Sequence, residues 1–135
     1  MTDFDAIKSK AKKLWSTFGP FENVTGLAAP KLIQFSGIQA NDLVLDVGCG
    51  TGVVAITASR IGAKASGSDL TPELIDQAIV NASIAGLDID FKVADVENLP
   101  YEDESFDFVV SQFGHMFSPR PELSTREMLR VLKPG

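Results

Sequence analysis

Residues 43–52 read Leu-Val-Leu-Asp-Val-Gly-Cys-Gly-Thr-Gly, and this stretch decides the fold. Its first half is a continuous apolar run of the kind that forms a strand buried on both faces of a sheet. Its second half alternates glycine with small residues, and the residues after it read as a helix. Glycine reaches positive φ without strain and has no Cβ, so the backbone of such a turn can touch a small ligand. The following helix offers unpaired N–H groups at its start, and the turn is therefore a predicted ligand site.

The rest of the chain alternates strands with helices. Thr71 as N-cap and Pro72 at the first helical position open a helix that Gly86 ends. The expected strands lie at 43–47, 63–70, 89–94 and 106–111, and further helices lie at 51–61 and 122–132. This alternation predicts an α/β fold with a parallel sheet and right-handed crossovers.

The N-terminal segment carries apolar residues at helical spacing, namely Phe4, Ile7, Ala11, Leu14, Trp15 and Phe18. Such a helix either covers a core face, closes a ligand pocket as a lid, or lies on a membrane surface. A second helix is expected at about 25–36, with Gly37 at its end. Together these helices form a predicted cap over 1–37 of a single domain that spans 1–135.

Composition limits the classes of function. The chain has 135 residues, 44% hydrophobic residues and a formal net charge of −6. Without a dense basic cluster, binding of nucleic acid through its phosphates is disfavoured. Cys49 is the only cysteine, so no intrachain disulfide can form. Neither a signal peptide nor a membrane span is visible in the sequence, and we expect a cytoplasmic protein.

Polar residues follow each expected strand at its carboxyl end, where open α/β sheets bind ligands. Asp69 ends the second strand and is placed to accept hydrogen bonds from ribose hydroxyls. Asp95 ends the third and is suited to an exocyclic amine such as that of adenine, while Gln112 ends the fourth. The alternative is that Asp69 and Asp95 are ordinary solvated residues of turns. Asp46 either orients the glycine turn through backbone N–H groups or faces a ligand ammonium.

The glycine spacing separates this turn from a dinucleotide fingerprint. That fingerprint is G-x-G-x-x-G, with its third glycine inside the helix. Here the glycines stand at 48, 50 and 52, and Val53 occupies the place of the third fingerprint glycine. The turn therefore departs from the pyrophosphate-binding pattern.

Several segments together resemble the class I S-adenosylmethionine-dependent methyltransferases. Residues 45–52 look like their first motif, and residues 67–74 look like their second strand with its ribose-binding acid. Residues 94–101 resemble the adenine-binding segment, and residues 105–107 resemble the lead into the fourth strand. Residues 127–135 look like the helix and turn before the fifth strand. The small-molecule branch that includes the ubiquinone/menaquinone-biosynthesis methyltransferases is the most similar, and the resemblance covers roughly residues 20 to 135.

The resemblance implies a Rossmann-like, doubly wound parallel sheet in the order 3-2-1-4-5-7-6. Family members continue past the turn at 133–135 into three more strands, which help to form the substrate pocket. This chain then holds the N-terminal half, with strand order 3-2-1-4, and its fourth strand has an edge without a neighbour. Either a partner chain covers that edge, as in a homo-oligomer, or the chain is a fragment of a longer domain.

The resemblance also implies S-adenosyl-L-methionine as the cofactor. The implied cofactor-binding residues are Asp46, Gly48, Cys49, Gly50, Gly52, Asp69, Leu70, Asp95, Val96, Gln112 and Phe113. The glycines approach the methionine moiety, Leu70 packs on the adenine, the Val96 N–H lies near it, and Gln112 and Phe113 line the methionyl end and the substrate mouth.

The implied activity is methyl transfer to a small-molecule acceptor, for which the enzyme mainly aligns the nucleophile. His115 is a weak candidate for a general base. The alternative is that it is a hydrogen-bonded residue in the wall of the pocket. No His and Cys cluster has zinc spacing, so no metal is expected.

Two alternatives stay open at this point. One is a cofactor-binding or interaction module without turnover, because the acceptor half is absent. The other is a nicotinamide-dependent oxidoreductase. The sequence does not name the methyl acceptor.

Overall fold

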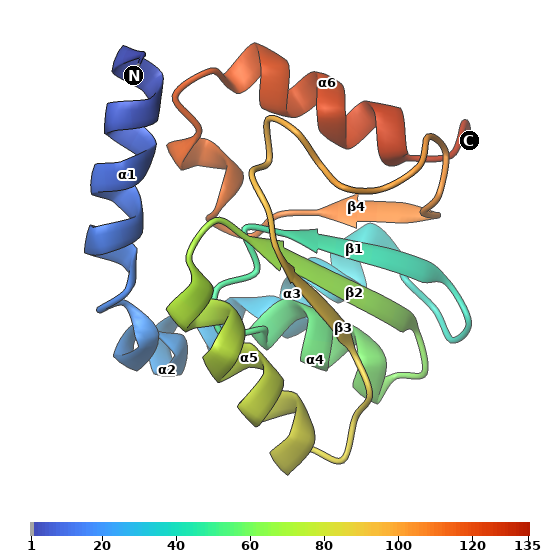
Figure 1. Cartoon of the computed structure of the whole chain (residues 1–135). Helices are drawn as coiled ribbons and strands as arrows, with labels where there is room; N and C mark the ends of the chain where they lie inside the picture. The colour runs from blue at the N-terminus through green and yellow to red at the C-terminus, as the bar shows by residue number, and fades with distance from the viewer. Residues whose placement is uncertain (1) are drawn as a thin grey trace.

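Parallel strands form one sheet, with β1 inside it (Figure 1). The computed structural model describes residues 2–135, with β1 at Leu43–Val47, β2 at Lys64–Asp69, β3 at Asp90–Val93 and β4 at Phe108–Val110. The strand order is β3-β2-β1-β4, and each neighbouring pair is parallel. The predicted α/β fold with strand order 3-2-1-4 is confirmed.

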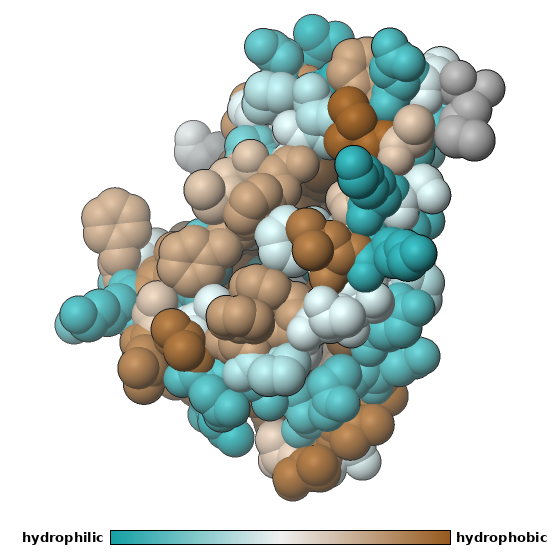
Figure 2. All heavy atoms as spheres, turned by 90° about the vertical axis from the view of Figure 1, so that its left-hand side faces the viewer, coloured by the Kyte–Doolittle hydropathy of each residue, from teal (hydrophilic) through white to brown (hydrophobic). Residues whose placement is uncertain are grey.

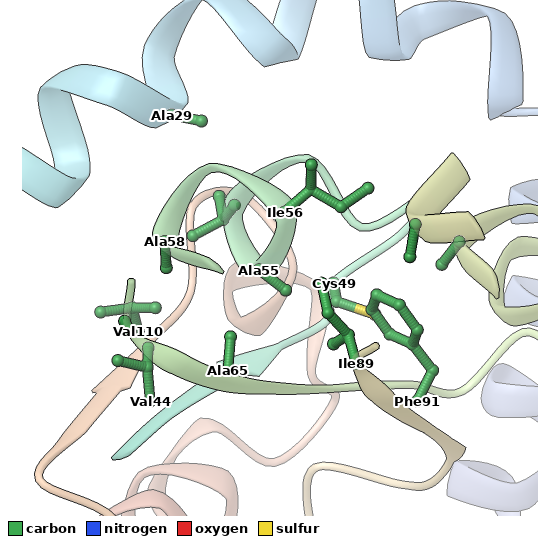
Figure 3. Packing of buried hydrophobic residues seen from close by; sticks show 14 of the residues in the cluster. Ala29, Val44, Cys49, Ala55, Ile56, Ala58, Ala65, Ile89, Phe91 and Val110 are labelled. Atoms are coloured by element: carbon green, nitrogen blue, oxygen red, sulfur yellow. The ribbon is translucent and has the colours of Figure 1, made fainter. Parts of the chain in front are cut away.

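Helices cover both faces of the sheet because successive side chains of a strand point to opposite sides. On one face α4 (Val53–Arg60) and α5 (Pro72–Ile84) pack against the strands, and α3 (Ala29–Ser36) packs on α4. That core includes Val44, Ala55, Ala65, Phe91 and Val110 (Figure 3). On the other face Leu45 and Val47 pack with Phe106 and with Val131 of α6 (Pro121–Val131).

A glycine in β2 supports the turn that follows β1. A Cβ at Gly67 would lie 2.6 Å from Cδ1 of Phe91 and 3.1 Å from Sγ of Cys49. Without that Cβ, the Phe91 ring and the Cys49 thiol pack against β2 in the core (Figure 3). The side chain of Cys49 thereby anchors the glycine turn to the sheet.

The expected helix at 25–36 is the clearest departure from the sequence prediction. The structure divides this region into α2 (Glu22–Thr25), the 3-10 turn η2 (Gly26–Ala28) and α3. Pro30 lies in the first turn of α3, where its missing N–H costs nothing, whereas inside a longer helix it would clash with the preceding turn. Gly37 ends α3 with φ 76°, as predicted.

The cap of α5 at Thr71 is a second departure from the sequence prediction. It occupies the N-cap position of α5, but its side chain makes no capping hydrogen bond. Asp69 takes over part of that role, because its Oδ1 accepts the Thr71 N–H at 2.9 Å. Thr71 is fully buried, and its hydroxyl has no hydrogen-bond partner within the described part of the chain.

The N-terminal helix α1 (Asp3–Trp15) stands beside the strand ends rather than on the sheet (Figure 1). A capping box between Thr2 and Asp5 starts it. None of its residues is buried, so the interpretation of α1 as the cover of a core face is wrong. Within residues 2–135, we find no helix with the length and apolar character that a bilayer crossing requires.

The outer edge of β4 is only partly paired. After α6, Leu132 forms a parallel bridge with Phe106, and the Lys133 N–H donates to the Phe106 carbonyl at 2.8 Å. The chain thus begins to run alongside β4 at its far edge. Within residues 2–135, β1 is the strand that pairs with Phe108–Val110.

Candidate functional site

The glycine turn has the backbone that the sequence predicts. Gly48, Gly50 and Gly52 have φ values of 65°, 53° and 88°. A Cβ at Gly50 would meet nothing within 4 Å, so the turn has open space beside its backbone there. A Cβ at Gly48 would lie 2.6 Å from Cα of Gly114, because the segment after β4 crosses the turn backbone to backbone. Close packing therefore requires glycine at position 48, and Gly50 leaves room for a ligand.

Asp46 fixes the turn to the helix behind it. Its side chain is buried, and Oδ2 accepts the Ala55 N–H at 3.1 Å, within the first turn of α4. Burial raises the pKa of Asp46 to about 8, with a further contribution from the charge of Asp69 and an opposing one from the Ala55 N–H. Of the two sequence interpretations, the described contacts support an orienting role toward the backbone.

Asp69 connects the glycine turn to the loop after β2. Its Oδ2 accepts the Gly50 N–H at 2.9 Å, while Oδ1 accepts the Thr71 N–H. Burial raises the pKa of Asp69 above its ordinary value despite these bonds. A carboxylate offers about four acceptor positions, so each oxygen keeps capacity for a further donor.

Asp95 belongs to a network of charges that the sequence analysis did not foresee. Its Oδ1 accepts the Glu97 N–H at 3.0 Å, and its Oδ2 lies 2.6 Å from Nζ of Lys8 on α1. Lys8 also contacts the carboxylate of Glu97, which has 1% of its side chain exposed. No sequence signal pairs Lys8 with Glu97, because 89 positions separate them.

Glu97 gathers donors from two further places. Arg120 donates to it from Nε at 2.8 Å and from its backbone N–H at 2.9 Å, and Ser118 donates from Oγ at 3.0 Å. Burial opposes ionisation of Glu97, but the bonds from Arg120, Lys8 and Ser118 outweigh it and lower its pKa to about 2. Glu97 is therefore a charged junction between α1, the loop after β3 and the start of α6.

A cavity of about 170 Å³ lies among these groups. The predicted residues that line it are Asp46, Gly48, Cys49, Gly50, Asp69, Leu70, Asp95, Val96, Gln112, Phe113 and His115. Gly52 is not among them, and a Cβ there would lie 3.0 Å from the Phe91 ring, so its position serves core packing. The structure thus brings the glycine turn and all the other predicted site residues around one cavity.

Aromatic residues of the N-terminal region close another side of the cavity. Trp15 and Phe18 line it, together with Phe117 from the segment after β4. The ring centroids of Trp15 and Phe117 are 4.7 Å apart. On the face that carries α1, apolar side chains gather in the middle, and polar ones dominate the right-hand margin of the view (Figure 2). Phe117 reaches the cavity through the conformation of the segment after β4.

Gln112 presents a polar atom that lacks a partner. Its Nε2 donates to the Thr25 carbonyl at 2.7 Å, which fixes the orientation of the amide. The buried Oε1 has no hydrogen-bond partner within residues 2–135 and is free to accept one from a ligand. His115 lies on the cavity wall, with Nε2 3.1 Å from Oγ1 of Thr125.

Comparison with known proteins gives the family. A family model described as a methyltransferase domain matches residues 44–135. This chain belongs to the class I S-adenosylmethionine-dependent methyltransferases. The match begins in β1 and includes the glycine turn, Asp69, Asp95 and the end of β4.

The chain is also similar to individual proteins. The chain is 41% identical to the Mycobacterium tuberculosis protein Rv1403c, over 84% of this chain and 42% of that protein. It is 41% identical to the ubiquinone/menaquinone biosynthesis C-methyltransferase UbiE of Bdellovibrio bacteriovorus, over 78% of this chain and 46% of the enzyme. The crystal structure of a methyltransferase from Aquifex aeolicus shares the fold, with a TM-score of 0.76 and 22% identity, over 99% of this chain and 69% of that one. The chain spans about half the length of the curated relatives it matches.

Proposed function

We propose that this methyltransferase domain binds S-adenosyl-L-methionine in the cavity between the glycine turn and α1, and that the protein methylates a small molecule. The observation that carries the proposal is the convergence of Gly50, Asp69 and Asp95 on one cavity. These groups come from the ends of three neighbouring strands, which is where open α/β sheets bind nucleosides.

The residues of the cavity fit the parts of such a cofactor. Asp69 keeps acceptor capacity for ribose hydroxyls, and the half-buried Asp95 keeps it for an adenine amine. The open space beside Gly50 suits the methionine moiety, and the unpartnered Oε1 of Gln112 suits its ammonium group. The Asp69 carboxyl group also suits a sulfonium, since it lines the cavity.

The bound cofactor supplies an activated methyl group, so the chain's own task is to hold and orient it. Backbone N–H groups and carboxylates at strand ends do this without an acid or base at the reacting atom. Phe113, Phe117 and Trp15 give the same cavity an apolar side. His115 is within the lining and stays a candidate base for acceptors that must lose a proton.

A small-molecule acceptor is supported by two observations. The relative from Bdellovibrio bacteriovorus is named for ubiquinone and menaquinone biosynthesis, whose products are small molecules. The net charge of −6 disfavours nucleic acid as the acceptor. We accordingly propose a small-molecule acceptor and keep the cytoplasmic location that the sequence leads us to expect.

Calorimetry with S-adenosylhomocysteine tests the cofactor proposal. The wild-type chain should bind it, and Asp69→Asn should weaken binding by about 1.5–3 kcal/mol because charge-assisted bonds to the ribose are lost. The matched control is Asp76→Asn on the exposed side of α5, which should bind like wild type. Equal affinity of Asp69→Asn and wild type would remove the ribose assignment.

A thermal-shift panel separates this proposal from a nicotinamide enzyme. S-adenosylmethionine and its demethylated product should raise the melting temperature, and NAD should leave it unchanged. A ligand at one hundred times its Kd stabilises the fold by about 2.7 kcal/mol, which such a panel detects easily. Stabilisation by NAD alone would overturn the proposal.

Turnover is measured separately as the release of S-adenosylhomocysteine in the presence of candidate acceptors. Apolar phenols, amines and carbon acids should be compared on this chain. Binding of the cofactor with no release for any acceptor would favour the cofactor-binding module over the enzyme.

A further inference from the structure

We propose that Lys8 is a positioning residue that latches helix α1 over the adenosyl end of the cofactor. The inference rests on the proposed function, because it concerns retention of the same ligand. Its starting point is an unusual contrast: α1 has no buried residue, yet four of its residues line the cavity. These are Ile7, Lys8, Ala11 and Trp15.

Few contacts hold α1 in that place. Lys8 contacts Asp95 and Glu97, the Arg120 guanidinium carbon lies 4.9 Å above the centre of the Phe4 ring, and Trp15 packs on Phe117. Lys8 contributes the ion pairs of this set, and its side chain is 12% exposed. Ion pairs that are largely withdrawn from water hold their geometry more strongly than surface pairs do.

The Lys8 ammonium bridges two neighbouring carboxylates. Asp95 and Glu97 would repel each other without a cation between them, and Arg120 occupies the other side of Glu97. Asp95 uses one oxygen for the Glu97 N–H and one for Lys8. Each of its oxygens still has a second acceptor position, so an adenine amine can bind while the latch is closed. Lys8 therefore acts on the cofactor through Asp95 and through the placement of α1.

This arrangement predicts how the cofactor enters and leaves. With Lys8 in place, Ile7, Ala11 and Trp15 stand across the cavity, and release of the ligand requires α1 to move. Because α1 adds no buried residue to the core, it can swing away without unfolding the sheet. The broken ion pairs are the main resistance to that motion.

The chain contains its own reporter for the experiment. Trp15 is the only tryptophan, it lies on α1, and it faces Phe117 in the cavity. Quenching of its fluorescence by acrylamide reports whether α1 is closed. The test variant is Lys8→Met, which keeps the length of the side chain and removes the charge. The matched control is Lys13→Met, because Lys13 is an exposed residue of the same helix.

In ligand-free protein, Lys8→Met should make Trp15 more accessible to acrylamide, and Lys13→Met should not. With S-adenosylhomocysteine bound, stopped-flow measurement should show release about tenfold faster from Lys8→Met, because both ion pairs that hold α1 in place are lost. Lys8→Arg should restore slow release, since a guanidinium can also contact both carboxylates. A structural defect in α1 alone would not be repaired in this way.

The two proposals fail in different ways. If Lys8→Met and Lys13→Met give the same quenching and the same release rate, the latch is refuted although the cofactor binds. If wild-type protein does not bind S-adenosylhomocysteine, the proposed function falls and retention of the cofactor falls with it. In that case the ligand-free quenching still decides whether Lys8 holds α1 closed.

Discussion

The cavity has two walls that are built in opposite ways. The turn wall consists of Asp46, residues 48–51 and Asp69, and hydrogen bonds to the neighbouring backbone hold it at the end of the sheet. The helix wall consists of α1, which has no buried residue and is held by side chains at its surface. The turn wall is part of the core, so it keeps its shape with or without a ligand. The helix wall can open while the core stays intact.

The largest expected effect breaks the turn wall at its closest contact. A Cβ at Gly114 would lie 2.6 Å from Cα and 2.7 Å from the carbonyl oxygen of Gly48. Both neighbours are backbone, so Gly114→Ala should lower the free energy of unfolding by about 3 kcal/mol. Urea unfolding followed by circular dichroism measures the loss. Gly19→Ala, just after the helix wall, meets nothing within 4 Å and should stay within about 0.5 kcal/mol of wild type. Equal urea midpoints for both variants would show that the turn and the segment after β4 can separate at little cost in free energy.

The next effect concerns the pH dependence of the turn wall. The pKa of Asp46 in the folded protein is about 8, above the ordinary 3.8. The folded state therefore binds its proton more tightly, and this contribution to stability is lost as pH rises from about 4 to about 8. Between pH 5 and pH 7 wild type should lose about 2–3 kcal/mol relative to Asp46→Asn. Parallel stability curves for the two proteins over that interval would mean that Asp46 is ionised at neutral pH.

Glu97, which contacts Lys8 of the helix wall, should respond to pH with the opposite sign. The pKa of Glu97 is about 2 in the folded protein, below the ordinary 4.5. Ionised Glu97 thus stabilises the fold above pH 4.5, and this contribution is lost as pH falls toward 2. The groups that face Glu97 are Lys8, Arg120, Ser118 and Asp95, whose Oδ1 accepts the Glu97 N–H. Since Arg120 is partly exposed, we expect about 1 kcal/mol between pH 4.5 and pH 3. Glu97→Gln should flatten the curve there, and an unchanged slope would assign the acid transition to other carboxylates.

The two walls also differ in how well the sequence predicts them. The turn wall follows from a strand, a glycine turn and a helix within residues 43–60, and such local patterns fix backbone geometry. Asp69 and Asp95 could be placed near it because parallel strands end on the same side of a sheet. The contact between Gly48 and Gly114 could not be predicted, because it depends on the path of the segment after β4.

The helix wall shows where sequence reasoning fails. An apolar stripe on an amphipathic helix predicts that the stripe is covered, and it does not say whether a core or a cavity covers it. Nothing in the sequence around Lys8 indicates that it bridges Asp95 and Glu97. Pro30, by contrast, did carry a usable signal, since a proline inside the expected helix at 25–36 indicates an interruption.

The smallest expected effect tests whether the helix wall opens independently of the core. Thr2→Ala removes the hydroxyl that accepts the Asp5 N–H at 3.1 Å and so weakens the capping box of α1. The local opening free energy of α1 should fall by about 1 kcal/mol, which corresponds to roughly fivefold faster amide exchange there. The global free energy of unfolding should stay within about 0.5 kcal/mol, because α1 adds no buried residue. Ser9→Ala, an exposed substitution in the same helix, should leave the exchange of α1 equal or slower, since alanine favours helix. If β1 and α1 lost protection together in Thr2→Ala, the two walls would open as one cooperative unit, and α1 could not act as a separate lid.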